Sequence, residues 1–243
     1  MNSMDKYILD QNSSTSVLDD FHSSSIQVHE HVSTTTGEKS KSAYLFIKRA
    51  MDIFFSALAL IVLSPLFLIV AAAIKIDSRG PIFYAHQRVG HNGSILNLYK
   101  FRSMYKNAGE MFANFTPEQK KEYEEHFKLD NDPRVTKVGG FLRESSLDEL
   151  PQLLNILLGN LSLVGPRPVV EKELDIKYGI DTERFLSVKP GLTGYWQVNG
   201  RSDIAYHERK SLELYYVDNA SLGLDIKILF MTVPAVFKKL GAK

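Results

Sequence analysis

The strongest pattern along the chain is an apolar run without charges over residues 53–74, IFFSALALIVLSPLFLIVAAAI. At 1.5 Å per residue, a straight helix of this length would reach about 33 Å, enough to cross a bilayer. A cleaved signal peptide is disfavoured, because about 50 residues would have to form its basic first region. Two interpretations therefore compete: a straight membrane span and a re-entrant helical hairpin.

The pair Ser64-Pro65 divides this run near its middle. Pro65 removes one backbone donor and kinks a helix, and the Ser64 hydroxyl can bond a freed carbonyl inside lipid. Each arm would then be about 14 to 18 Å long, roughly half the bilayer depth. A span predicts a basic excess on one flank only, whereas here both flanks are basic. The flanking cations are Lys41, Lys48 and Arg49 before the run, and Lys75, Arg79, Arg88, Lys100 and Arg102 after it. Because ordinary spans also contain prolines, the residues alone leave both interpretations open.

Polar residues dominate the segment before the run. The first 40 residues contain 13 Ser or Thr, and such a segment buries too little apolar surface to offset its ordering entropy. We therefore expect a disordered tail over residues 1–44. It contains His29-Glu30-His31, for which a solvated polar tract is favoured over a metal site.

The remainder of the chain shows the patterns of a mixed, mainly helical fold. Alternation of apolar and polar residues around Asn92-Gly93 predicts a β-hairpin over residues 82–104. Ser146 is expected to cap a helix over residues 146–158, whose apolar face is leucine-rich and which ends at Gly159. Further helices are expected at 108–128, with a restart at 116–118, and at 204–217 and 226–240; loops are expected at 130–134, 164–168 and 189–201. The helix at 226–240 is amphipathic, which fits either a membrane interface or packing on the core.

Composition changes this picture little. Net charge is +1 and charged residues make up 23% of the chain, so nothing indicates a nucleic-acid partner. The chain has no cysteine, which excludes disulfides and thiolate metal sites. It also lacks the motifs G-x-G-x-x-G, G-x-x-x-x-G-K-[ST], G-x-S-x-G and H-E-x-x-H, which argues against dinucleotide-binding oxidoreductases, P-loop kinases, serine hydrolases and zinc proteases.

Cations recur in the loops and at element ends after the apolar run. They are Lys100, Arg102, Arg143, Arg167 and Arg201, and several stand in Gly- or Pro-containing loops where backbone N–H groups can approach an anion. Guanidinium groups bind phosphate oxygens in bidentate fashion, so the recurrence favours phosphate over scattered surface charge.

The adjacent carboxylates Asp148 and Glu149 are the second candidate site. In isolation, two acidic residues at a helix start are explained by the helix dipole alone. Beside phosphate-binding cations, a carboxylate can instead be a Mg²⁺ ligand or a nucleophile that accepts a phosphoryl group.

From about Lys48 to Lys243 the chain resembles the bacterial sugar transferase family, the monotopic phosphoglycosyl transferases. The resemblance rests on four long segments in order: KRAMDIFFSALALIVLSPLFLI, YKFRSM, DPRVTKVGGFLRESSLDELPQLLNILLGNLSLVGPRP and KPGLTGYWQVNGR. Larger members of the family add four spanning helices and a further domain before this core. The resemblance implies an α+β, mainly helical fold, in which a re-entrant membrane helical hairpin at 45–79 precedes a small cytosolic catalytic domain at 80–243 with amphipathic interface helices.

The resemblance also implies roles for particular residues. Ser64 and Pro65 match the family's helix break, Asp148 its nucleophile, and Glu149 its Mg²⁺ ligand. A further group matches loops that bind substrate or phosphate: Lys100, Arg102, Arg167, Gln197, Arg201 and Glu213. At Glu213 relatives often carry Asp, which weakens the assignment of a direct role to this residue.

The reaction implied by the resemblance starts from UDP-hexose and undecaprenyl phosphate and yields undecaprenyl diphosphate hexose and UMP through a phospho-aspartate. We expect it at the cytoplasmic face of a bacterial inner membrane, as the first membrane step of exopolysaccharide synthesis, with galactose favoured over glucose by resemblance alone. Two other functions are a catalytically silent membrane adaptor and a pyrophosphatase that uses water as acceptor. The sequence does not decide whether the chain forms a homo-oligomer.

Overall fold

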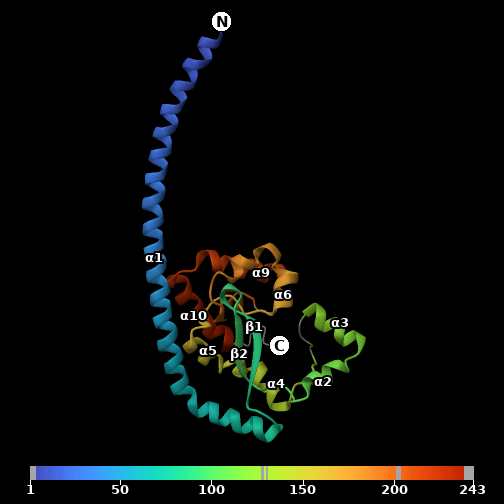
Figure 1. Ribbon diagram of the computed structural model, residues 1–243. Helices are drawn as coiled ribbons and strands as arrows, with labels where there is room; N and C mark the ends of the chain where they lie inside the picture. Colours follow the sequence, from blue (N-terminus) through green and yellow to red (C-terminus); the bar gives the residue numbers. More distant parts are fainter. Residues whose placement is uncertain (1–3, 127–128, 130, 201–203, 238–243) are drawn as a thin grey trace. The chain divides into compact units, whose positions relative to one another are not determined.

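The fold is mainly helical (Figure 1), and the part of the chain that the structure describes contains two two-stranded sheets. The computed structural model describes the backbone of residues 4–126, 129, 131–200 and 204–237, and the side chains of residues 41–123, 129, 131–200 and 204–235. The chain divides into two units, Met1–Ile47 and Lys48–Lys243, and all contacts given below lie within the second. The predicted division into tail, membrane segment and catalytic domain stays a prediction.

Helix α1, Met4–Asp77, contains the whole apolar run, with Pro65 inside it. Among the described residues, its part from Lys41 to Asp77 is the one helix long and apolar enough to cross a membrane. Figure 1 shows the ribbon of α1 changing direction in its C-terminal part. The helix continues through Pro65 because the Ser64 hydroxyl donates a 2.8 Å hydrogen bond to the Ile61 carbonyl, which the proline leaves without its helical donor.

Within the second unit, one face of α1 is covered by other residues of that unit on both sides of Pro65. Before the proline, Leu60 and Leu63 pack against a cluster formed by β2 and α5, and after it Val70 and Ile74 are themselves buried. The opposite face is exposed and apolar, including Phe54, Phe55, Leu58, Ile61, Val62, Leu68 and Ile69. The apolar run therefore has a protein-facing side and an uncovered side.

The predicted β-hairpin is confirmed. Strands β1, Phe83–Val89, and β2, Ile95–Phe101, pair antiparallel from Phe83 opposite Phe101 to Val89 opposite Ile95. The turn between them, η1 at His91–Gly93, places Asn92 at φ 53° and Gly93 at φ 77°. Both are left-handed conformations that asparagine and glycine adopt readily, which explains the Asn-Gly pair.

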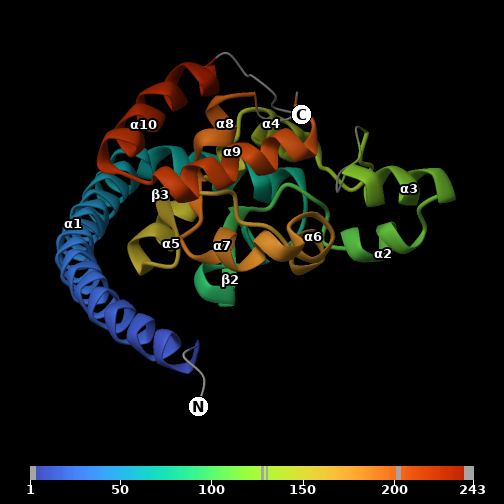
Figure 2. The same cartoon turned by 90° about the horizontal axis from the view of Figure 1, so that it is seen from above.

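The predicted charged helix at 108–128 is two helices, α2, Ala108–Ala113, and α3, Pro117–His126, with the restart where the sequence placed it. Thr116 and Gln119 bond each other's backbone N–H groups at the start of α3, a reciprocal capping box. The Arg134 guanidinium lies 5.0 to 5.5 Å from three ring centres, those of Phe112 in α2, Phe115 between the two helices and Tyr123 in α3. These contacts hold α2 and α3 together at one side of the unit (Figure 2).

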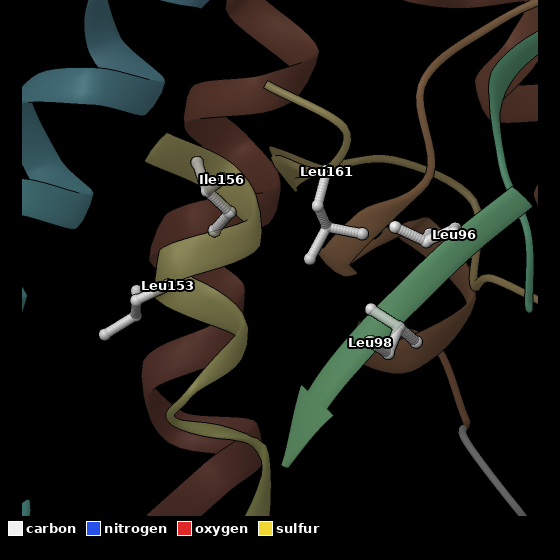
Figure 3. Packing of buried hydrophobic residues seen from close by; sticks show 5 residues of the cluster. All are labelled: Leu96, Leu98, Leu153, Ile156 and Leu161. Atoms are coloured by element: carbon white, nitrogen blue, oxygen red, sulfur yellow. The ribbon is translucent and has the colours of Figure 1, made fainter. Parts of the chain in front are cut away.

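The core is built where β2 meets the helices that follow α3. These are α4, Lys137–Glu144, and α5, Gln152–Leu158, with the short turn η2, Leu147–Glu149, between them. Figure 3 shows one cluster at close range: Leu96 and Leu98 on β2, Leu153 and Ile156 on α5, and Leu161 on the segment after α5. Gly159 ends α5 at φ 88°, as predicted.

The second sheet was not predicted. It consists of β3, Ser162–Val164, and β4, Gly191–Thr193, paired in parallel. Between them lie α6, Glu171–Lys177, η3, Gly179–Asp181, and α7, Thr182–Leu186. After them come α8, Tyr195–Val198, α9, Tyr206–Asn219, and α10, Leu222–Phe237.

Helices α9 and α10 confirm the two predicted C-terminal helices within the described residues, with bounds shifted by a few positions. Ile228 of α10 is fully buried and belongs to a cluster with Val164 and Tyr216. Phe230 and Val233 of the same helix are exposed. Helix α10 therefore packs on the core by one side and presents apolar residues on another.

Candidate active site

The site forms where the end of β2 meets η2 and α5. Asn155 fixes the two elements, because its side chain accepts from the backbone N–H of Tyr99 at 2.9 Å and donates to the carbonyl of Asn97 at 2.8 Å. These two hydrogen bonds align α5 along β2 and bring Glu149 close to Lys100. The Lys100 Nζ lies 2.7 Å from the Glu149 Oε1 and 3.8 Å from the Asp148 Oδ2.

Asp148 and Glu149 stand in a short 3-10 turn rather than in the first turn of one long helix. Ser146 adopts φ 57° and makes no side-chain cap hydrogen bond, and α5 begins only at Gln152, after Pro151. The predicted cap and the predicted single helix over 146–158 are therefore wrong. The left-handed Ser146 reverses the chain just after α4, and the proline separates the turn from α5. Asp148 is buried as a result, with 7% of its surface exposed.

Opposing effects act on the pKa of the Asp148 carboxyl. Burial raises the pKa of its carboxyl to about 6; Lys100, Arg143 and Arg167 oppose this, while the neighbouring Glu149 adds to it. The carboxylate is thus mostly ionised at neutral pH yet weakly solvated. An ionised, desolvated carboxylate beside cations is suited to act as a nucleophile.

Two Gly-containing loops, which carry Gly165 and Gly191, form the other side of the site. Gly165 donates to the Thr193 carbonyl at 2.9 Å and Gly191 to the Pro166 carbonyl at 2.8 Å. A Cβ on Gly165 would lie 2.4 Å from the Lys189 carbonyl oxygen, and one on Gly191 would lie 2.0 Å from the Gly165 nitrogen. The loops approach this closely only because both positions lack a side chain, and their contact fixes the segment that carries Arg167.

A small cleft between these two sides brings together four of the predicted site residues: Lys100, Glu149, Arg167 and Gln197. Asp148 lies beside the cleft, against Lys100. Gln197 is buried and its Oε1 has no hydrogen-bond partner among the described residues. The Arg167 guanidinium lies 5.8 Å from the centre of the Trp196 ring. The cleft is also lined by Arg88, Leu98, Gln152, Pro168, Gly191 and Leu192.

Two predicted site residues lie elsewhere, and a third is outside the described residues. Arg102 binds the end of α1, where it donates to the carbonyls of Arg79 and Ser78 at 3.0 and 2.6 Å. Glu213 is 1% exposed and lies against Arg209 and the Tyr178 hydroxyl, at 3.2 and 3.3 Å. Arg102 therefore binds backbone carbonyls just after α1 and Glu213 belongs to a buried ion network, and neither lines the cleft. Arg201 lies outside the described residues.

Two residues on β1 were missed by the sequence analysis. Arg88 lines the cleft, and His86 is opposite Leu98 in the hairpin, on the sheet face that also carries Lys100. Burial, followed by the charges of Arg88 and Lys100, lowers the pKa of His86 to about 4, so its imidazole is neutral. The alternation of the predicted hairpin was the signal that could have placed both residues beside Lys100.

The carboxylate pair fits a Mg²⁺ ion in its donor chemistry. Among the described side chains, no group of three or more His, Asp or Glu residues gathers as a metal site. Mg²⁺, however, is commonly held by one or two carboxylates together with waters and substrate phosphates. The Lys100 ammonium within 4 Å of both Asp148 and Glu149 shows that the pair accommodates positive charge.

Curated relatives share most of this chain. An exopolysaccharide production protein of Sinorhizobium fredii is 48% identical over 198 residues, covering 80% of this chain and 87% of the relative. The undecaprenyl-phosphate galactose phosphotransferase of Salmonella typhimurium is 46% identical over 206 residues. The undecaprenyl-phosphate glucose phosphotransferase of Komagataeibacter xylinus is 39% identical over 196 residues. These two matches cover 84% and 76% of this chain but only 43% and 35% of the two relatives.

The family model of the bacterial sugar transferases matches residues 43–239. This range includes the apolar run of α1, the β-hairpin, the turn with Asp148 and Glu149, both Gly-containing loops and α10. The chain therefore belongs to the bacterial sugar transferase family.

Proposed function

We propose that this enzyme transfers hexose 1-phosphate from a UDP-hexose to undecaprenyl phosphate and releases UMP. Galactose is the favoured hexose and glucose the alternative, since the relatives include phosphotransferases named for each sugar. The observation that carries the proposal is the buried Asp148, held beside Lys100 and Glu149 next to a cleft lined by arginines. The product would begin an exopolysaccharide, as the name of one relative suggests.

The chemistry proceeds in two displacements. An oxygen of Asp148 attacks the β-phosphorus, the bond from that phosphorus to the bridging oxygen breaks, and UMP leaves with the electron pair. An oxygen of the lipid phosphate then attacks the same phosphorus and expels the carboxylate. Because the nucleophile is an anion that must approach another anion, neutralisation of charge dominates the barrier.

The residues of the cleft supply that neutralisation. Arg167 offers a planar pair of donors to the transferring phosphoryl group, and Lys100 adds a point charge beside the nucleophile. Glu149 would hold a Mg²⁺ ion, which would stabilise negative charge on the phosphoryl oxygens when bound. Gln197 has a buried amide at the cleft and suits a hydroxyl or amide group of the donor.

The distribution of apolar surface supports a site at the membrane surface. Within the second unit, α1 packs against the rest of that unit both before and after Pro65, through Leu63 on one side and Val70 on the other. A straight span would carry one of these packed arms, with its protein neighbours, into the bilayer. A re-entrant hairpin keeps the unit at the cytoplasmic face of the inner membrane, and the exposed Phe230 and Val233 of α10 suit the interface.

A covalent adduct tests the proposal. Purified protein is incubated with Mg²⁺ and UDP-galactose labelled in the β-phosphate, without lipid. The wild-type chain should gain the mass of a hexose phosphate and release UMP, and added undecaprenyl phosphate should discharge the adduct. Asp148→Asn should trap nothing, because an amide is a far weaker nucleophile, whereas Glu149→Gln should fold but react slowly.

The other outcomes separate the alternative functions. Release of UDP in place of UMP would identify an ordinary glycosyltransferase. Release of UMP without lipid, in amounts exceeding the protein, would identify a pyrophosphatase. Binding of UDP-sugars with no release at all would identify an adaptor. A screen of UDP-galactose, UDP-glucose and their N-acetyl forms then decides which hexose is transferred.

A further inference from the structure

Three buried donors beside the cleft lack hydrogen-bond partners among the described residues. They are the Nε of Arg88, the Nη2 of Arg209 and the Nε1 of Trp196. The Arg209 guanidinium lies 4.4 Å from the centre of the Trp196 ring, and Arg88 and Arg209 both contact Glu173. A buried donor without an acceptor destabilises a folded protein, so this cluster is suited to bind an acceptor.

Of these three groups, Arg88 is the one that lines the cleft. The charged residues lining the cleft are Arg88, Lys100, Arg167 and Glu149, and the one carboxylate among them is 2.7 Å from Lys100. The lining of the cleft therefore carries three cations and one carboxylate. Burial and the neighbouring Arg167 lower the pKa of Arg88 to about 10, so the side chain is still protonated at neutral pH and repels its neighbour.

The surrounding network orients Arg88 without using its Nε. The Arg88 Nη1 is 4.0 Å from Glu173, at the limit of an ion pair. Glu173 is itself engaged by Arg209 at 3.0 Å and by the Tyr206 hydroxyl at 2.7 Å. Glu173 of α6 thus contacts both Arg88 of β1 and Arg209 of α9, and Arg209 is also paired with Glu213 of α9. Glu173 is therefore a positioning residue for Arg88.

We propose that Arg88 binds a phosphate oxygen of a substrate through its free Nε–H, in the cleft that Arg167 also lines. The inference rests on the proposed function, which supplies two phosphate-bearing ligands: the diphosphate of the nucleotide sugar and the phosphate of the polyprenyl lipid. The chemistry of recognition is the same for both. A phosphate between the two guanidinium groups would remove their repulsion and give Arg88 the acceptor that its Nε lacks.

The test compares Arg88→Lys and Arg88→Gln with the wild-type chain. Lysine keeps the charge near Glu173 but removes the Nε–H, so the Lys variant remains informative even if the Gln variant fails to fold. Arg184→Gln is the matched control, because Arg184 is half exposed and pairs with Asp218 on the surface. UMP binding is measured by the fluorescence of Trp196, the single tryptophan of the chain, and discharge of the Asp148 adduct by undecaprenyl phosphate is timed separately.

Both Arg88 variants should lose about ten- to a hundredfold in one arm of the experiment, while the control matches the wild type. Weakened UMP binding assigns Arg88 to the nucleotide phosphates. Normal UMP binding with slow discharge assigns it to the lipid phosphate. Folded Arg88 variants that match the wild type in both arms overturn the inference. If the wild-type chain turns over no UDP-hexose, the proposed function fails, and binding of UMP and of inorganic diphosphate still decides the role of Arg88.

Discussion

The Ser64 hydroxyl donates a 2.8 Å hydrogen bond to the carbonyl of Ile61. Ile61 lies four residues before Pro65, so its carbonyl is the one from which the proline removes the helical donor. An unpaired carbonyl in hydrocarbon costs several kcal/mol, and Ile61 is among the exposed residues of α1. The serine therefore supplies a donor to the carbonyl that the proline leaves without its helical partner.

The first prediction concerns the topology of α1. We expect the apolar run to enter and leave the membrane on the same face. Single cysteines replacing Ser42 and Ala85, in a chain that has none of its own, should both react with a membrane-impermeant thiol reagent from the cytoplasmic side only. Labelling of position 42 from the periplasm would instead establish a span. Pro65→Leu should straighten the helix and give mixed labelling, with Leu63→Ile as a control that keeps the proline.

The second prediction concerns pH. Because burial raises the pKa of Asp148 to about 6, the nucleophile is lost by protonation as pH falls through this value. The single-turnover rate of adduct formation should therefore rise with pH along a limb centred near 6. Glu149→Gln removes a like charge, so it should move this limb to lower pH while lowering the maximal rate. Lys100→Met removes the opposing cation and should move the limb to higher pH. A limb that stays in place in both variants would assign the titration to a group other than Asp148.

Local patterns predicted much of the fold. The Asn92-Gly93 turn, the restart at Pro117 and the end of α5 at Gly159 each depend on residues close in sequence. The sheet of β3 and β4 was missed, because each strand has three residues and the partners are far apart in the chain. The split between η2 and α5 was missed as well, because a cap residue with positive φ cannot be distinguished by residue type alone from an ordinary serine cap.

The candidate site was predicted in part for a similar reason. Long motifs identified Asp148, Glu149, Lys100 and Arg167, which the structure places together. Arg102 stands two residues after Lys100 in the same motif, yet the end of β2 directs it to the carbonyls at the end of α1. The role of Arg88 depends on its pairing with Glu173 of α6, a distant contact that no pattern within the motif contains.

The third prediction concerns Arg167. We expect Arg167→Lys to lose about ten- to a hundredfold in turnover, which corresponds to one charge-assisted contact of about 1.5 to 3 kcal/mol. The reason is that lysine keeps the charge but offers no planar pair of donors. UMP release with added lipid measures the loss, and Arg184→Lys on the surface of α7 should leave turnover unchanged. Full activity in a folded Arg167→Lys protein would mean that this guanidinium has a structural role against Trp196.

The fourth prediction uses two adjacent glycines of α4. A Cβ on Gly139 would lie 1.9 Å from the backbone oxygen of Ser103, whereas one on Gly140 would meet no atom within 4 Å. Gly139→Ala should therefore force α4 away from the strand end and destabilise the protein by about 1 to 3 kcal/mol. It should also lower activity, because Arg143 of the same helix donates to the Ser103 hydroxyl at 2.9 Å and acts on the charge of Asp148.

Gly140→Ala is the matched control, and we expect it to stabilise the helix by about 0.5 to 1 kcal/mol, because alanine loses less backbone freedom on folding than glycine. Thermal unfolding in detergent and UMP release, measured on both variants, test the pair. If Gly139→Ala were as stable and as active as Gly140→Ala, α4 could shift without cost, and its contact with Ser103 would not position Arg143. If Gly139→Ala were destabilised but fully active, the contact would hold the fold together and the cation at Asp148 would not depend on it.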